Sequence, residues 1–82
     1  MRKIEYKDSV RREQRRIDRI VAKRILAKIE QELTADDLVP EPLHGPYGGL
    51  YKLRVGDYRV IYTFSANAIL VVHIVHRSDA YR

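Results

Sequence analysis

The clearest pattern in the chain is the alternation of apolar and polar residues from Leu50 to Tyr62. It continues on both sides of Gly56-Asp57, which is typical of two half-buried strands joined by a two-residue turn. In that register Arg54 lies opposite Arg59. The predicted core face carries Tyr51, Leu53, Val55, Tyr58, Val60 and Tyr62, and the opposite face carries Lys52, Arg54 and Arg59. Facing arginines repel each other, and a bound polyanion would relieve that repulsion.

Two helices are predicted before this hairpin. Residues 2–7 alternate as a short first strand does, and Asp8 or Ser9 can cap a first helix that has few apolar residues. Asp18 offers a second cap. Beyond it, apolar residues at helical spacing predict a second, amphipathic helix. Those residues are Ala22, Ile25, Leu26, Ile29 and Leu33.

The remaining segments are a connector and a last strand. Residues 34–49 hold all three prolines and are predicted to contain no helix or strand. Ile69 to Val75 is an apolar run broken only by His73, which we expect to be packed and hydrogen-bonded. The predicted order is β-α-α-β-β-β. This order indicates an α+β fold in which two N-terminal helices pack on one face of a mostly antiparallel sheet, as a single domain over residues 1–82.

Composition narrows the function classes. The chain has 82 residues, no cysteine and a formal charge of +5, and it shows neither a signal peptide nor an apolar run of bilayer length. We therefore expect a cytoplasmic protein without disulfide or thiolate chemistry. Eleven of the sixteen basic residues lie in residues 1–31. That cluster fits a nucleic acid or an acidic partner, and equally a solvated helix face.

A candidate site follows from extending the sheet. If Ser65 pairs with Ala68, Arg59 pairs with Ile74, and His76 lies on the same face as the arginines. Arg77 and Tyr81 follow in a tail that can fold back across this face. The alternative is that such basic residues only protect the sheet from edge pairing.

This set of side chains suits RNA cleavage without a metal. Attack by a ribose 2′-hydroxyl requires deprotonation of one oxygen, protonation of another and stabilisation of the phosphate charge. Arginine gives forked donors to phosphate, and histidine carries protons near neutrality. A lysine among arginines has its ammonium form disfavoured, as a general base requires. An aromatic ring can stack on an unpaired base.

The chain resembles the RelE/ParE superfamily of toxins from toxin–antitoxin pairs, and the resemblance runs nearly end to end. The motifs that carry it are Leu43-His44-Gly45, the hairpin from Gly49 to Tyr62 with its G-x-Y-R-hydrophobic-x-Y pattern, and the ending His76-Arg77-Ser78-Asp79-Ala80-Tyr81-Arg82. The RelE branch cleaves messenger RNA in the ribosomal A site, whereas the ParE branch poisons DNA gyrase. The presence of both Lys52 and Tyr81 favours the RelE branch.

The RelE-like interpretation implies a role for each candidate residue. Lys52 is the general base or a phosphate contact, Arg54 supports the transition state, and Arg59 clamps the scissile phosphate. His76 or Arg77 is the acid, and Tyr81 orients or stacks on the substrate. The resemblance further implies a ribosome-dependent endoribonuclease that uses no cofactor or metal. It also implies a RelB-like antitoxin that wraps the toxin with a helix in a hetero-oligomer. The alternatives are a gyrase inhibitor and a nucleic-acid-binding module that does not cleave.

Overall fold

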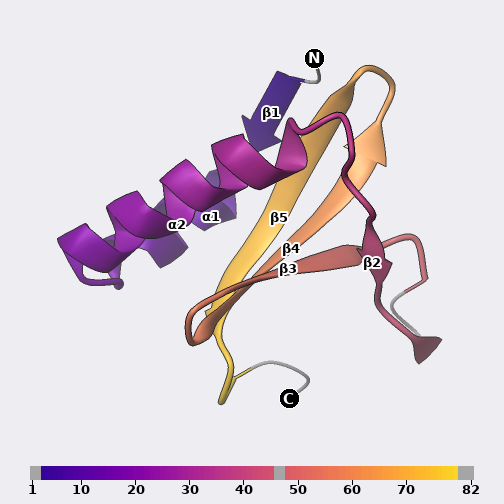
Figure 1. Ribbon diagram of the computed structural model, residues 1–82. Coiled ribbons are helices and arrows are strands. Elements are labelled where there is room, and N and C mark those ends of the chain that lie inside the picture. The colour runs from indigo at the N-terminus through magenta and orange to yellow at the C-terminus, as the bar shows by residue number, and fades with distance from the viewer. Residues whose placement is uncertain (1–2, 46–47, 80–82) are drawn as a thin grey trace.

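The computed structural model describes residues 3–45 and 48–79 as two helices and a twisted five-stranded sheet (Figure 1). The elements are β1 (Lys3–Tyr6), α1 (Asp8–Arg15), α2 (Arg19–Leu33), β2 (Glu41–Pro42), β3 (Tyr51–Val55), β4 (Tyr58–Ser65) and β5 (Ala68–His76). The strand order is β1-β5-β4-β3-β2. Only β1 and β5 pair in parallel among these strands. The predicted α+β fold is confirmed, but the connector was wrongly predicted to lack a strand, because it contains β2.

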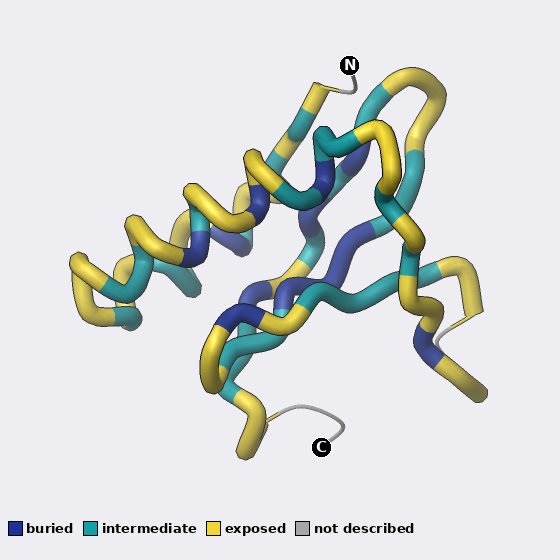
Figure 2. The backbone as a smooth tube through the Cα atoms, in the orientation of Figure 1, coloured by how far each residue is buried: buried dark blue, intermediate teal, exposed yellow. Residues whose placement is uncertain are grey.

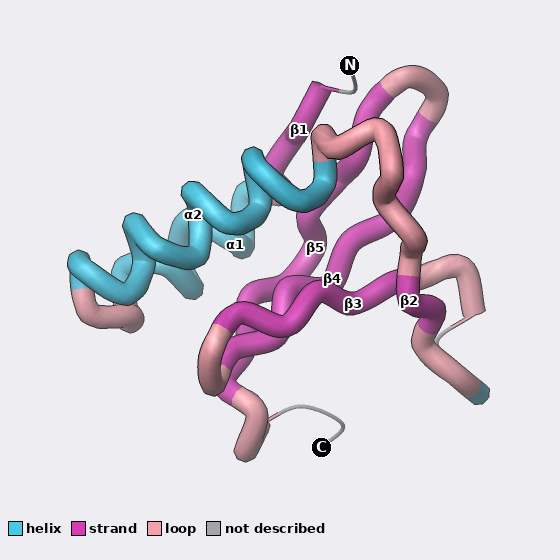
Figure 3. Tube along the Cα trace, viewed as in Figure 1, coloured by secondary structure: helices cyan, strands magenta, loops and turns pink. Residues whose placement is uncertain are grey.

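Both helices lie on one side of the sheet (Figure 3), where α1 packs against β5 and α2 reaches β3. The core forms between these layers, and Figure 2 shows buried positions spaced along α2. Its fully or nearly fully buried members are Val10, Ile25, Ile29, Leu33, Val55, Val60, Tyr62, Ile69, Val71 and Ile74. Three of the five residues predicted as the apolar stripe of α2 are therefore buried, and the other two, Ala22 and Leu26, are half-buried.

The helix caps agree with the sequence for α2 only. Asp18 precedes α2, and its carboxylate accepts hydrogen bonds from the backbone amides of Ile20 (3.1 Å) and Val21 (3.3 Å). This satisfies amides that have no partner within the helix. The prediction for α1 was wrong, since Lys7 is its N-cap residue and provides no side-chain bond. Asp8 lies in the first turn instead, where a negative charge favours the helix dipole.

The β3–β4 hairpin has the predicted register. Val55 pairs with Tyr58, Arg54 with Arg59 and Leu53 with Val60. Gly56 has a φ of 59° at the first central position of the turn, where type II′ hairpins place glycine because side chains disfavour that backbone region. The hairpin is therefore set by local sequence alone.

The β4–β5 pairing departs from the prediction halfway along. Ser65 pairs with Ala68 as expected, but the register shifts between Ile61, opposite His73, and Tyr62, opposite Val71. Val72 is thus an extra residue on β5, and Arg59 pairs with Val75 rather than with Ile74. A bulge of one residue moves every following side chain to the other face of the strand. This shift decides which tail residue joins the arginines.

Tyr6 links β1 to α2. Its hydroxyl donates to Oε1 of Glu30 at 3.3 Å. Partial burial of the phenol, followed by the nearby Glu30 carboxylate and this hydrogen bond, raises the pKa of Tyr6 to about 12. The side chain therefore stays neutral and continues to donate this bond over the physiological pH range. Neither helix in the described part of the chain has the length and apolar character needed to cross a membrane.

Candidate functional site

Three arginines line one small pocket at the β3–β4 turn, here called the arginine pocket. Its lining residues are Arg54, Gly56, Asp57, Tyr58, Arg59 and Arg77. Arg54 and Arg59 come from the hairpin and lie opposite each other, so their Cβ atoms are about 5 Å apart. Arg77 comes from the residue just after β5. Residues far apart in sequence thus place three guanidinium groups around one space.

Arg77 is positioned by the hairpin turn. Its backbone amide donates to the Asp57 carbonyl oxygen at 2.8 Å, and its Nε lies 3.9 Å from Oδ1 of Asp57. Both side chains are largely exposed, at 71% and 68%. An ion pair that exposed is weak, so the guanidinium remains accessible to a phosphate. The backbone bond fixes where Arg77 starts, and the side chain can still reorient.

Lys52 lies on the same face of β3 as Arg54 but outside the arginine pocket. It is two residues along the strand, which is about 7 Å, and it pairs with Ile61 on β4 and Glu41 on β2. Its Nζ is 3.5 Å from Oε1 of Glu41. The predicted basic face therefore exists, and it contains a carboxylate that the sequence did not indicate.

His76 was predicted on the wrong face. Because of the bulge at Val72 it pairs with Tyr58, and its ring packs edge-on against that phenol with a centroid distance of 5.3 Å. It lines a hollow between sheet and helix together with Glu13 and Arg16 of the helical layer. Its Nδ1 accepts the backbone amide of Ser78 at 3.2 Å, which requires that nitrogen to be unprotonated. His76 is thus separated from the arginine pocket by the sheet.

Two further predictions have different outcomes. Tyr81, the proposed stacking residue, lies outside the described residues. His73 is hydrogen-bonded as expected, through Nδ1 to Oε2 of Glu13 at 3.3 Å, but its side chain is 52% exposed rather than packed. The same carboxylate of Glu13 accepts the amide of Ile74 at 3.3 Å. Glu13 thus takes the place of a neighbouring strand where β1 has ended.

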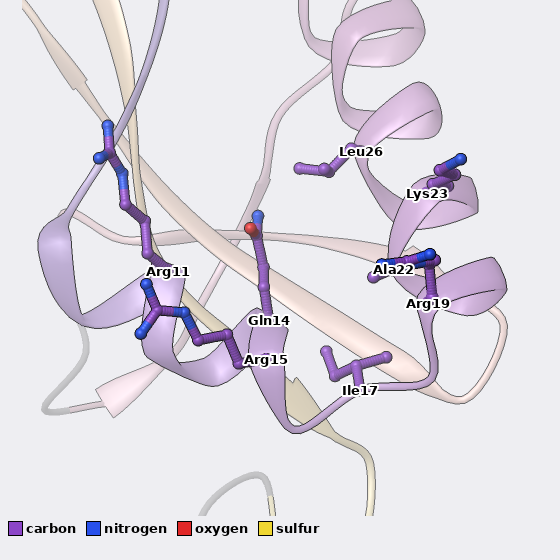
Figure 4. Close-up of a pocket in the computed structure, with 8 residues that line it drawn as sticks. All are labelled: Arg11, Gln14, Arg15, Ile17, Arg19, Ala22, Lys23 and Leu26. Atoms are coloured by element: carbon purple, nitrogen blue, oxygen red, sulfur yellow. The ribbon is translucent and has the colours of Figure 1, made fainter.

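A second basic surface lies between the helices, here called the basic groove (Figure 4). Arg11 and Arg15 lie on its α1 side and Arg19 and Lys23 on its α2 side. These pairs have the four-residue spacing that puts side chains on one helix face. Gln14, Ile17, Ala22 and Leu26 complete the lining. The N-terminal excess of positive charge is therefore partly concentrated in one concave surface.

Sequence reasoning missed three carboxylates that contact the candidate residues. Asp57 was identified only as a turn residue, and Glu41 stood in a segment taken to be a connector. Glu13 lies in a run of charged residues that has no apolar period. None of the three has a local signal, since each finds its partner through strand pairing or helix packing. Within residues 3–45 and 48–79, no cluster of three histidine or acidic side chains could hold a metal ion.

Comparison with solved structures finds the same fold in three toxins. The chain aligns with the toxin–antitoxin complex RelBE2 of Mycobacterium tuberculosis with a TM-score of 0.77 and 18% identity, covering 95% of this chain and 93% of that one. For the RelB–RelE complex of Methanococcus jannaschii the values are 0.70, 21%, 94% and 94%. For the isolated RelE toxin of E. coli they are 0.73, 15%, 93% and 84%.

Sequence comparison identifies the family. No curated protein matches the chain. A family model does match residues 4–81, and it describes the ParE toxin of the type II toxin–antitoxin system parDE. The match spans both helices, the hairpin and the arginine pocket. The chain therefore belongs to the ParE toxin family of type II toxin–antitoxin systems, within the RelE/ParE superfamily that its sequence resembles.

Proposed function

We propose that this toxin is a ribosome-dependent endoribonuclease that cleaves messenger RNA in the ribosomal A site. The observation that carries the proposal is the arginine pocket, with Lys52 on the same face. Three guanidinium groups and one ammonium converge on a surface away from the core. Such a group of donors suits a phosphate that gains negative charge during reaction.

The chemistry is an in-line transfer within the RNA. The 2′-oxygen forms a bond to the adjacent phosphorus while the bond from phosphorus to the 5′-oxygen breaks. The products are a 2′,3′-cyclic phosphate and a 5′-hydroxyl. Arg59 clamps the non-bridging oxygens, Arg54 stabilises the charge that develops, and Arg77 donates to the leaving 5′-oxygen. Lys52 serves as the base or as a further phosphate contact, and Tyr81 stacks on a base of the substrate.

Two partners follow from this proposal. The basic groove supplies a cationic surface for ribosomal RNA, separate from the pocket that acts on the messenger. The relatives in the RelBE2 and RelB–RelE structures are complexed with antitoxins. By analogy, this chain assembles with a RelB-like antitoxin that wraps it with a helix. Its site of action is the cytoplasm, where ribosomes translate.

The direct test is primer extension on a reporter messenger RNA in a reconstituted translation reaction, with and without ribosomes. We expect new 3′ ends within codons only when both toxin and ribosomes are present. Intact messenger RNA with normal translation would contradict the proposal. In that case a supercoiling assay with gyrase would separate a ParE-type inhibitor from a module that only binds nucleic acid.

Reversing charge in the basic groove should weaken ribosome-dependent cleavage. In Arg15→Glu/Arg19→Glu, one cation on each wall becomes an anion that repels ribosomal RNA. Since electrostatic steering changes association rates by about 10-fold or more, we expect cleavage at limiting toxin to fall by at least about tenfold.

The matched control is Arg12→Glu/Arg24→Glu, which makes the same charge change on exposed residues of the same helices outside the groove lining. The control should lose far less. Equal losses in both variants would mean that net charge matters and the groove does not. The readout is the initial rate of cleavage at two ionic strengths, because the loss through steering shrinks as salt screens it.

A further inference from the structure

We propose that Glu41 is a built-in competitor of the RNA phosphate, occupying the Lys52 ammonium until RNA displaces it. This inference rests on the proposed function, because it takes RNA phosphate as the ligand. It assigns a role to a residue outside the family motifs described above. It also decides between the two roles open to Lys52, which becomes a phosphate-binding cation rather than the base.

The geometry places Glu41 between Lys52 and solvent. The two residues are directly opposite each other on β2 and β3, so their side chains leave the same face of the sheet. The Lys52 side chain is only 16% exposed, whereas that of Glu41 is 60% exposed. The carboxylate is therefore the solvent-facing member of the pair. A phosphate that approaches the ammonium from solvent meets Glu41 first.

The position of Glu41 is fixed by the backbone. β2 has only two residues, and the second, Pro42, pairs with Tyr51. The next residue, Leu43, is 7% exposed and donates its amide to the Leu50 carbonyl oxygen at 2.9 Å. The strand is thus anchored on the side that follows Glu41. Releasing Lys52 requires only rotation of an exposed side chain, without separation of the strands.

The ion pair is loose enough to exchange. Its 3.5 Å separation exceeds the roughly 2.8 Å typical of strong charge-assisted hydrogen bonds. Glu41 is also hydrated, which further weakens the pair. A phosphate bridging Lys52 and the arginine pocket gains several charged donors at once and therefore replaces the carboxylate. Until then, the carboxylate stabilises the charged form of Lys52, which is the form that binds phosphate and cannot accept a proton.

The test measures RNA binding without cleavage. A fluorescent single-stranded RNA hexamer with 2′-O-methyl groups serves as probe, because a methylated 2′-oxygen cannot attack phosphorus. Removing a competing carboxylate from a partly exposed pair should tighten binding about twofold to fivefold in Glu41→Gln. The gain should vanish in Glu41→Gln/Lys52→Met compared with Lys52→Met alone. In the translation assay, KM should fall while kcat stays unchanged.

The control for charge is Glu5→Gln, which makes the same change on β1 at the far edge of the sheet. An equal gain in that variant, or a gain that persists in the Lys52→Met background, would overturn the inference while leaving the proposed function intact. A fall in kcat for Glu41→Gln would also overturn it, because Glu41 would then take part in the chemistry. A wild-type chain that neither binds the hexamer nor cleaves would defeat the proposed function itself.

Discussion

Arg59→Ala is expected to reduce cleavage by about 100-fold to 1,000-fold while leaving the fold intact. Removing one fixed donor from a site that stabilises developing charge has an effect of this size. Arg59 is on β4, and its side chain lines the arginine pocket on the face away from the core. The neighbouring core residue Val60 is fully buried on the other face. The loss should therefore be catalytic, with circular dichroism and the denaturation midpoint close to wild type.

Two further variants sharpen this prediction. Arg59→Lys keeps the charge but loses the forked donor geometry, so it should recover part of the activity. Arg24→Ala removes an exposed arginine of α2 that does not line either basic surface, and should cleave like wild type. If Arg59→Ala unfolded the protein, the assignment of Arg59 to the outer face would be wrong. Full activity in a folded Arg59→Ala variant would remove the arginine pocket as the site of reaction.

Arg77→Ala is expected to reduce cleavage by about 100-fold, whereas His76→Phe should stay within about threefold of wild type. The physical reason is the bulge at Val72, which turns His76 to the helix side and leaves Arg77 in the arginine pocket. Loss of a guanidinium that donates to the leaving oxygen removes transition-state stabilisation. The phenylalanine retains an aromatic ring against Tyr58 and removes only the titratable nitrogens.

The pH profile of cleavage provides a second readout. A catalytic histidine would give a pH dependence that disappears in His76→Phe, and we expect the two profiles to have the same shape. NMR contacts between the rings of Tyr58 and His76 would check the register directly. Inactivity of His76→Phe together with full activity of Arg77→Ala would restore the unbulged register and the histidine as acid.

Much of the fold and half of the site follow from local sequence. Alternation around Gly56-Asp57 determined the hairpin register, and that register alone placed Arg54 opposite Arg59. Asp18 capped α2 as predicted because a side-chain oxygen next to exposed amides needs no distant partner. The strands, their core face and the basic face were therefore predictable, since each depends on residues close together in the chain.

Only the tertiary structure decided the rest of the site. Ile69 to Val75 is apolar at nearly every position, so either register buries an apolar side chain and the pattern cannot reveal an extra Val72. The two residues of β2 are too few to show a period, so the contact of Glu41 with Lys52 appears only when the strands pair. The sequence by itself determined which side chains can bind a phosphate. Long-range pairing decided which of them meet, because one residue of register exchanges the two faces of a strand.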